Sequence, residues 1–438
     1  MKDKAKTSVG PSASLRTNNI IKKNTIGILS LGCPRNLVDS ETILGRLSSK
    51  GYSIAENISA AEIGIVNTCA FIEEARRESI DAILDLVELK KEGRLKKIIV
   101  CGCLPQRYKS RLKKELPEVD AFMGKLSLNH QSWRFPITPR HYAYLKICEG
   151  CINQCSFCVI PKIKGRLCSL DMDAVISQVK KFNAHEGFSE INIIGQDTSG
   201  YGMDLYTRPK LSTLLKEVLK NSPAINWVRL LYLYPGRVTD DLLKLIRDSS
   251  RVCRYIDLPI QHINDRILKL MNRNTTRKEI AALVEKIRKF IPGVFLRSSV
   301  ITGFPSETEK EFKELLDFLR EVKFERLGAF SYSREEGTAA YDFKGHLPQE
   351  LKIERLNRIM SMQQKISQEV NNRFLGRVID VLIDEQEGDA YLGRSEYDAP
   401  EVDGSVFVRS KKRLKPGDFV KVKITDTLEY DLAGEAVE

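Results

Sequence analysis

The chain has 438 residues, of which 42% are hydrophobic and 29% are charged, and its formal net charge is +12. This length predicts two or three domains, and the composition is that of a globular protein rather than a disordered or membrane-embedded one. No apolar run is long enough to span a membrane, and the opening segment lacks the apolar core of a signal peptide. We therefore expect a cytoplasmic protein with a flexible tail over residues 1–22.

From Thr25 onward, short β-rich runs alternate with amphipathic segments, which is the pattern of βα units around a parallel sheet. TIGILSL, EIGIVN and KIIVCG are predicted strands, and ETILGRLSSK and EEARRESIDAILDLVELKKE are predicted helices. This α/β domain is expected to occupy residues 23–135, and a short connector with Pro136 and Pro139 follows it.

A second βα series begins at Tyr144 and contains six strand candidates, each followed by a helical segment: AYLKIC, EINIIG, NWVRLLYL, YIDLPI, VFLRSSVI and RLGAFSYS. Six successive units predict an open, partial (βα)6 barrel. Together with a long helix from Leu347 to Asn372, this barrel is expected to span residues 136–372. Its active site should lie at the carboxyl ends of the strands.

Residues 373–438 contain strand-length runs separated by Gly, Pro and Asp turns, which predict a small all-β barrel. From Arg377 to Glu438 there are nine Lys and Arg residues against fifteen Asp and Glu residues, a net charge of −6, so the preceding residues carry +18. The overall basic charge would ordinarily favour a nucleic-acid partner. The acidic C-terminal domain counts against one.

Ten cysteines in a chain expected in a reducing compartment indicate metal or redox chemistry before disulfides. Cys151, Cys155 and Cys158 form a CxxxCxxC set directly after the first barrel strand. Three thiolates on an iron–sulfur cubane leave one iron open, and S-adenosylmethionine can bind it. The alternative is a structural zinc site with a fourth ligand from Cys148 or Cys168.

Three further cysteines, Cys33, Cys69 and Cys103, each lie just past one of the first three predicted strands of the N-terminal domain. Carboxyl ends of parallel strands meet at one edge of the sheet, where α/β folds bind ligands. We therefore expect a second three-thiolate cluster there, although each thiol taken singly could be an ordinary buried cysteine. The remaining cysteines are assigned to packing: Cys101, Cys148, Cys168 and Cys253.

Motifs distributed from about Gly27 to the C-terminal domain resemble the methylthiotransferase family of radical S-adenosylmethionine enzymes: SLGCPRNLVDSE, NTCAFIEEARRESI, CGCLPQ, EGCINQCSFCVIP, IIGQDTSGYG, YIDLPIQHINDRILKLMNR, ITGFPSETEKEF and YLGRSEYDAPEVDG. The resemblance implies a methylthiotransferase domain, a radical S-adenosylmethionine barrel and a C-terminal TRAM domain. SLGCPRN, NTCAFIEEA and SYSREEGTAA are similar to the RimO-type branch, which modifies an aspartate of small ribosomal subunit protein twelve. One element departs from the family, because GRLCSL stands where a basic RSR-like element is usual.

The resemblance implies radical chemistry at the β-carbon of that aspartate. The barrel cluster would donate an electron to S-adenosylmethionine, and the resulting 5′-deoxyadenosyl radical would abstract hydrogen. The second [4Fe-4S] cluster would hold the sulfur that is inserted with a methyl group. An electron donor and a sulfur source are implied partners. TRAM domains commonly bind RNA, but the acidic charge favours docking of a basic ribosomal protein and makes RNA less favoured.

Six residues are expected on the cofactor side of the barrel: Phe157, Gly195, Gln196, Asp197, Arg297 and Gly303. Phe157 matches the adenine-contacting aromatic position of the family motif, and core packing is its alternative. The glycines could serve only turns. A buried Arg297 needs a partner, either a cofactor carboxylate or a structural salt bridge. No catalytic residue is assigned beyond the cluster ligands. Pro259, Gln261 and His262 end the fourth strand and could line the same cavity, but we do not expect His262 to be catalytic.

Two alternative functions remain open. Within the family, the chain could be a MiaB-type enzyme that modifies a tRNA adenosine. Outside it, the cysteines could hold zinc in a non-catalytic RNA-binding protein. Iron and sulfide analysis distinguishes the second alternative from either enzyme.

Overall fold

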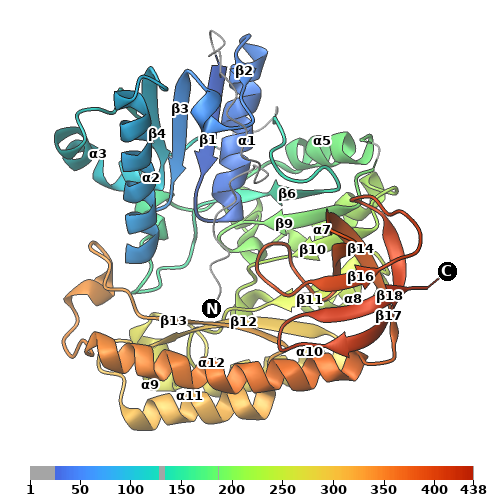
Figure 1. Ribbon diagram of the computed structural model, residues 1–438. Coiled ribbons are helices and arrows are strands. Elements are labelled where there is room, and N and C mark those ends of the chain that lie inside the picture. The colour runs from blue at the N-terminus through green and yellow to red at the C-terminus, as the bar shows by residue number, and fades with distance from the viewer. Residues whose placement is uncertain (1–24, 128–133, 186, 438) are drawn as a thin grey trace. The chain divides into compact units, whose positions relative to one another are not determined.

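The computed structural model describes residues 25–127, 134–185 and 187–437, and the chain divides into two compact units (Figure 1). The first unit comprises Met1–Ile137 and Cys158–Arg166, and the second comprises Thr138–Phe157 and Leu167–Glu438. The segment 1–22 lies outside the described residues. Among the residues that are described, no helix is long and apolar enough to cross a membrane.

The first unit is built on a parallel sheet with strand order β2-β1-β3-β4-β5. The chain moves outward from β1 to β2 and then returns to the other side of β1, so the direction of winding reverses between β1 and β3. Such a switch point is where doubly wound sheets bind ligands. The strands are β1 (Thr25–Ser30), β2 (Ser53–Ile54), β3 (Ile63–Thr68), β4 (Lys97–Gly102) and β5 (Ala121–Phe122).

Helices cover both faces of this sheet because alternate strand residues point to opposite sides. Ile65 packs with Leu44 of α1 (Pro34–Ser49) on one face. Its neighbour Val66 packs on the other face with Ile83 and Leu112, which belong to α2 (Glu73–Lys91) and α3 (Cys103–Glu115). The short helix α4 (Ile160–Ile163) joins this second layer. The predicted α/β class is confirmed.

The second unit contains six parallel strands in the order β13-β12-β11-β10-β9-β6. Consecutive strands are neighbours, and no pairing joins the edge strands β6 and β13 within the described residues, so the sheet forms the predicted open barrel. The strands are β6 (Tyr142–Lys146), β9 (Glu190–Ile194), β10 (Trp227–Leu230), β11 (Val252–Asp257), β12 (Phe295–Thr302) and β13 (Arg326–Ser331). A small antiparallel pair, β7 (Cys148–Glu149) and β8 (Cys168–Ser169), follows β6.

Helices follow the strands, and α12 lies along β12 and β13 (Figure 1). Capping boxes fix two helix starts, at Thr276 with Glu279 and at Thr308 with Glu311. The helices are α5 (Met172–Asn183), α6 (Met203–Tyr206), α7 (Leu211–Asn221), α8 (Asp240–Asp248), α9 (Asp265–Leu270), α10 (Arg277–Phe290), α11 (Glu309–Val322) and α12 (Gln349–Asn371).

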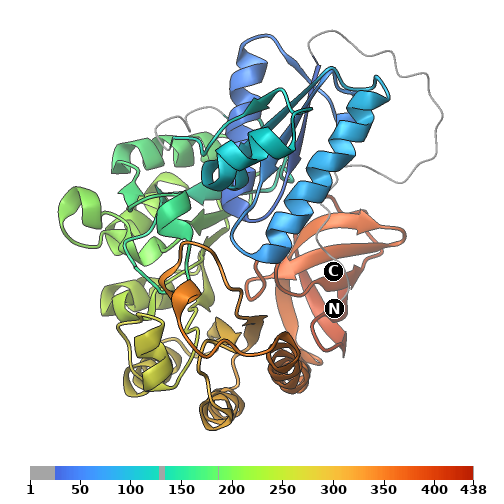
Figure 2. The ribbon, with the colours of Figure 1, turned by 90° about the vertical axis from the view of Figure 1, so that its left-hand side faces the viewer.

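The C-terminal strands form a closed five-stranded barrel in the order β14-β15-β16-β18-β17 (Figure 2). Alternate apolar residues such as Val406 and Val408 fill its interior. Closure removes the unpaired edges that a small sheet would otherwise expose. The strands are β14 (Val378–Glu387), β15 (Ala390–Ser395), β16 (Val406–Arg409), β17 (Phe419–Thr427) and β18 (Leu432–Ala436).

One segment of this domain, residues 394–403, is bound to the amino-terminal part of the parallel sheet, and we call it the plug segment. Its charged groups pair with strand residues that lie at or near the strand starts. The pairs are Arg394 with Glu190, Asp398 with Arg326, and Asp403 with Arg297. The opposite, carboxyl edge of the sheet is left for a functional site.

Candidate cluster and cofactor sites

Three cysteines of the first unit lie at the carboxyl ends of three neighbouring strands. Cys33 is the N-cap residue of α1, Cys69 follows β3, and Cys103 begins α3 directly after β4. Because β1, β3 and β4 are adjacent and parallel, the thiols share one edge of the sheet at the switch point.

Two glycines allow this close approach. A Cβ on Gly32 would stand 2.6 Å from Cβ of Cys69 and 2.9 Å from its sulfur. A Cβ on Gly102 would stand 2.3 Å from Oδ1 of Asn67. Both glycines also have positive φ angles, 85° and 93°, which other residues rarely adopt. Any side chain at either position would push the cysteine-bearing segments apart.

Two buried amides connect the three segments. The Asn36 side chain donates to the carbonyls of Leu31 and Thr68, at 3.1 and 2.9 Å, and its Oδ1 accepts from the Cys103 thiol at 3.8 Å. Asn67 Nδ2 donates to the Asn36 carbonyl at 2.8 Å. These bonds fix the loop positions independently of any bound group.

The electrostatic surroundings of the thiols differ. Burial opposes ionisation of Cys33, but the Arg35 guanidinium, the Asn36 backbone N–H and Lys164 lower the pKa of its thiol. Burial, with the nearby Cys33 and Cys103 sulfurs, raises the pKa of Cys69 to about 12. All ten cysteines are free thiols. Across the described ranges, no group of three or more Cys, His, Asp or Glu residues with the geometry to hold a metal ion is found.

In the second unit, Cys151 and Cys155 lie in the loop that follows β6 and β7. The Cys151 sulfur accepts hydrogen bonds from the backbone N–H and side-chain amide of Asn153, at 3.4 and 3.5 Å. The Asn153 side chain in turn donates to Asp197 at 2.7 Å and accepts from Arg237 at 2.6 Å. Asp197 and Arg237 form a salt bridge at 2.5 Å. The chain enters the first unit at Cys158, the third cysteine of the set.

The Gly195, Gln196 and Asp197 segment follows β9 and lies beside this loop. A Cβ on Gly195 would stand 2.6 Å from the Cys148 sulfur, so only glycine fits there. Gln196 donates to Glu149 at 3.1 Å, and Glu149 is paired with the buried Lys146 at 2.7 Å. Oδ2 of Asp197 accepts hydrogen bonds from Arg237 and Asn153. The segment is thus fixed by protein contacts, and its contact with a cofactor stays a prediction.

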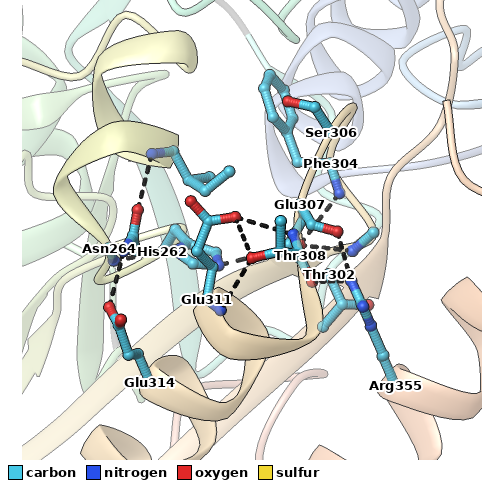
Figure 3. Close-up of polar contacts among 12 residues, drawn as sticks. His262, Asn264, Thr302, Phe304, Ser306, Glu307, Thr308, Glu311, Glu314 and Arg355 are labelled. Carbon is cyan, nitrogen blue, oxygen red and sulfur yellow. Dashed lines mark hydrogen bonds and ion pairs between the residues drawn. The ribbon is translucent and has the colours of Figure 1, made fainter. Parts of the chain in front are cut away.

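The loop after β12 is fixed by a buried carboxylate (Figure 3). Glu307 accepts from the backbone N–H groups of Gly303 and Phe304, at 2.8 and 3.2 Å, and pairs with Arg355 at 2.7 Å. Burial raises the pKa of Glu307 to about 7 in spite of these partners. Phe157 packs beside Phe304 in a small hydrophobic cluster, as its core-packing alternative predicts. An adenine contact for Phe157 stays untested.

His262 is fully buried, and its contacts are with neighbouring protein groups. Its Nδ1 accepts from the backbone N–H of Asn264 at 3.0 Å, and its Nε2 faces Glu307 at 3.9 Å (Figure 3). Burial lowers the pKa of His262 to about 3, so the imidazole is neutral. A neutral imidazole whose Nδ1 accepts carries its proton on Nε2.

Arg297 lies near the amino end of β12, away from the strand ends that carry Cys151 and Gly303. Its Nη1 pairs with Asp403 at 2.7 Å, and its Nε lies 3.7 Å from Asp257. The salt-bridge alternative therefore accounts for this charge. A contact with a cofactor carboxylate is untested.

One cysteine assignment needs correction. Cys101, Cys148 and Cys253 are buried, as packing residues should be, but Cys168 is exposed. It lies in the two-residue strand β8 opposite Glu149, and this short ribbon leaves the thiol facing solvent.

Four site residues were missed from the sequence: Asn153, Arg237, Arg273 and Glu307. Each follows the carboxyl end of a barrel strand, and that position was the available signal. Arg237 lies in the Pro235–Arg237 turn after β10. Arg273 follows α9, and its Nη1 donates to the Cys155 sulfur at 3.8 Å. Their roles depend on partners far along the chain, which spacing does not reveal.

Comparisons with known proteins match every part of this architecture. The profile of the uncharacterized protein family UPF0004 matches residues 25–124, that of the radical SAM superfamily matches residues 145–319, and that of the TRAM domain matches residues 375–437. Two relatives carry the name ribosomal protein uS12 methylthiotransferase RimO. The one from Clostridioides difficile is 45% identical over 94% of this chain and 98% of its own length. The one from Pelotomaculum thermopropionicum is 46% identical, over 94% and 99%.

A solved structure shares the fold at low sequence identity. The radical S-adenosylmethionine methyltransferase TsrM from Kitasatospora setae, with cobalamin and a [4Fe-4S] cluster bound, superposes with a TM-score of 0.51 at 12% identity. The match covers 73% of this chain and 74% of that chain. It agrees with the architecture described above and concerns the fold alone.

Proposed function

Because the chain belongs to the family of ribosomal protein uS12 methylthiotransferases, which are radical S-adenosylmethionine enzymes, we propose that it adds a methylthio group to the β-carbon of an aspartate of that protein. The proposed cofactors are S-adenosylmethionine and two [4Fe-4S] clusters, each held by three thiolates. The ligands are Cys33, Cys69 and Cys103 for one cluster and Cys151, Cys155 and Cys158 for the other. A separate electron donor and a sulfur source take part, and the reaction is placed in the cytoplasm.

The observation that carries this proposal is the gathering of three thiols at the switch point of the first sheet. An enzyme that only generates a radical needs one open cluster, whereas sulfur insertion needs a second site to hold the sulfur. The donor set there consists of thiols, which suit iron–sulfur clusters rather than oxygen-ligated ions. Gly32 and Gly102 bring these segments together by presenting no side chain. The donor chemistry of this thiol set therefore suits the proposed group.

Radical chemistry suits the proposed target, because an aspartate β-carbon has no acidic proton at neutral pH for ordinary acid–base catalysis. When bound, the clusters supply the electron that cleaves S-adenosylmethionine and the sulfur that is inserted. The protein itself holds and orients these groups. Asn153, Asp197 and Arg237 fix the Cys151 loop, and Glu307 fixes the loop at Gly303.

We keep five residues as proposed cofactor contacts, because all lie in loops at the carboxyl side of the barrel: Phe157, Gly195, Gln196, Asp197 and Gly303. Arg297 is left out, since its partner Asp403 binds it near the opposite strand ends.

We propose that the basic ribosomal protein docks in part on the β14–β15 hairpin of the TRAM domain. Glu385, Glu387 and Asp389 are exposed there and close together in sequence. Asp398 and Asp403 do not contribute, because the plug segment buries them in ion pairs with barrel arginines. Opposite charge favours encounter with a basic partner and weakens with salt.

The test is a direct comparison of substrates. Anaerobically reconstituted protein is incubated with S-adenosylmethionine, a sulfide source and a reductant, together with either uS12 or an anticodon stem-loop. We expect a methylthio group on one aspartate of uS12, located by peptide mass spectrometry, and transfer of deuterium from a labelled β-carbon into 5′-deoxyadenosine. Product on the stem-loop alone would refute the proposal in favour of a tRNA enzyme.

A further inference from the structure

Arg273 is a buried arginine that contacts a proposed cluster ligand. Only 8% of the residue is exposed, and its Nη1 donates to the Cys155 sulfur at 3.8 Å. Two other groups fix the guanidinium. Nη2 donates to the Pro259 carbonyl at 2.6 Å, and the guanidinium carbon lies 4.4 Å from the centre of the Tyr234 ring. Its Nε is buried and has no hydrogen-bond partner in the part of the chain that is described.

The charge of Arg273 is not balanced by a carboxylate. Five arginines are buried among the described residues, and the other four each have a carboxylate oxygen at 2.6–2.9 Å. Those four are Arg229, Arg326, Arg355 and Arg394. For Arg273, no carboxylate lies within salt-bridge distance anywhere in the described ranges. Arginine stays protonated in proteins, so this position carries an uncompensated buried cation.

Such a cation requires a counter-charge, because taking an unpaired charge out of water is strongly unfavourable. A carbonyl dipole and a ring face provide only part of it. Besides the unpartnered Nε, the guanidinium has Nη1, which is directed at the Cys155 sulfur. A thiolate-ligated iron–sulfur cluster is anionic, and it becomes more negative by one charge when it is reduced.

We propose that Arg273 is the counter-charge of the iron–sulfur cluster held through Cys155, and that its N–H···S contact favours the reduced state of that cluster. The inference rests on the proposed function, since it assumes that Cys155 is a cluster ligand. Reduction adds one electron to the cluster from a one-electron donor, with no bond made or broken in the protein. Hydrogen bonds to the sulfurs and nearby charge both set cluster potentials. Arg273 is thus a positioning residue rather than a catalytic one.

The test is anaerobic potentiometric reduction, with reduced viologens as electron donors and electron paramagnetic resonance as the readout. The full chain carries Cys33→Ala, Cys69→Ala and Cys103→Ala, so that only the barrel cluster reports. In Arg273→Gln, we expect the ratio of reduced to oxidised cluster at a fixed potential to fall about tenfold, which corresponds to about 59 mV for a one-electron couple. Arg273→Lys should recover part of this loss, because it keeps the charge.

Arg251→Gln is the matched control. Arg251 also donates to main-chain carbonyls, at 2.6 Å from Ser222 and Leu219. It has no hydrogen bond to a cysteine within the described ranges, and its removal should leave the midpoint unchanged. An unchanged midpoint in Arg273→Gln with normal iron content would overturn the inference. A raised KM for uS12 when Arg273→Gln is made in the chain that keeps all its cysteines would then assign Arg273 to a substrate carboxylate. Absence of any cluster in the parent chain would instead refute the proposed function. If Arg273→Gln loads no iron, the midpoint is measured in Arg273→Lys instead. A wild-type midpoint in Arg273→Lys, with iron binding lost only in Arg273→Gln, would support the role of the positive charge.

Discussion

Asp403 ties the plug segment to the barrel, and we predict that Asp403→Asn strongly destabilises the second unit. The carboxylate pairs with Arg297 at 2.7 Å and accepts from the Tyr255 hydroxyl at 2.6 Å and the Ala399 backbone N–H at 3.0 Å. Its side chain is 2% exposed and that of Arg297 is 17% exposed. The substitution keeps the shape of the side chain and removes its charge.

The expected cost follows from what is left behind. Breaking a buried ion pair typically costs about 3–5 kcal/mol, because the remaining charge is desolvated and unpaired. Asp257 lies 3.7 Å from Arg297 and retains part of the attraction, so we expect about 3 kcal/mol. Asp380→Asn in the same domain is the control. It breaks a pair with Lys421 in which both side chains are more than half exposed, and such pairs contribute about 0–1 kcal/mol.

Urea unfolding followed by tryptophan fluorescence measures both variants. Trp133 and Trp227 are the two tryptophans, and a Trp133→Phe background leaves Trp227, whose ring packs edge-on against Phe419 of the C-terminal barrel at 4.7 Å. Adding Arg297→Met to Asp403→Asn should restore part of the lost stability by removing the unpaired cation. Equal, small effects of Asp403→Asn and Asp380→Asn would contradict the importance that we assign to the plug segment.

Three further predictions address the clusters and the pH dependence. Cys155→Ala should retain about four of the roughly eight irons expected for two cubanes and should form no 5′-deoxyadenosine; loss of all iron would show that the two sites are misassigned. Gly102→Ala should lower iron binding by the first unit, because its Cβ would meet Asn67 and Thr68, and iron analysis in a Cys155→Ala background checks this. Burial opposes ionisation of Glu311, but Arg266 and Thr308 lower its pKa to about 2, so its stabilising effect is present above about pH 4.5 and lost as the pH falls toward 2. Glu311→Gln should therefore lower the free energy of unfolding by about 1–2 kcal/mol at pH 7, a modest value because the Arg266 side chain is half exposed and screened by solvent. Urea unfolding at pH 3 should show a smaller difference between this variant and the wild type.

The architecture was predictable because local pattern determines most of it. The runs from Thr25 to Ser30 and from Ile63 to Thr68 are β-rich and short, and the helices between strands have clear amphipathic periods. The thiols at the first switch point could also be anticipated, since a cysteine just past a parallel strand must lie at the ligand-binding edge.

Long-range pairing was not predictable. Asp403 and Arg297 are 106 positions apart in the chain. Asp398 and Asp403 belong to the acidic segment that suggested a docking surface, but they form ion pairs inside the protein. The segment Cys158–Arg166 follows a barrel motif, yet Val159 and Ile163 pack into the core of the first unit. The isolation of Arg273 is a property of what surrounds it in space, which no spacing in the sequence encodes.

The plug segment also constrains the order of folding during synthesis. The strands that contain Arg297 and Arg326 leave the ribosome well before residues 394–403, which supply their carboxylate partners. Until then, Arg297 and Arg326 lack these two carboxylate partners, and the folded barrel is less stable than it is in the complete chain. We therefore expect the second unit to become protease-resistant only after the C-terminal barrel has emerged, and a chain arrested before Asp398 to require chaperone protection.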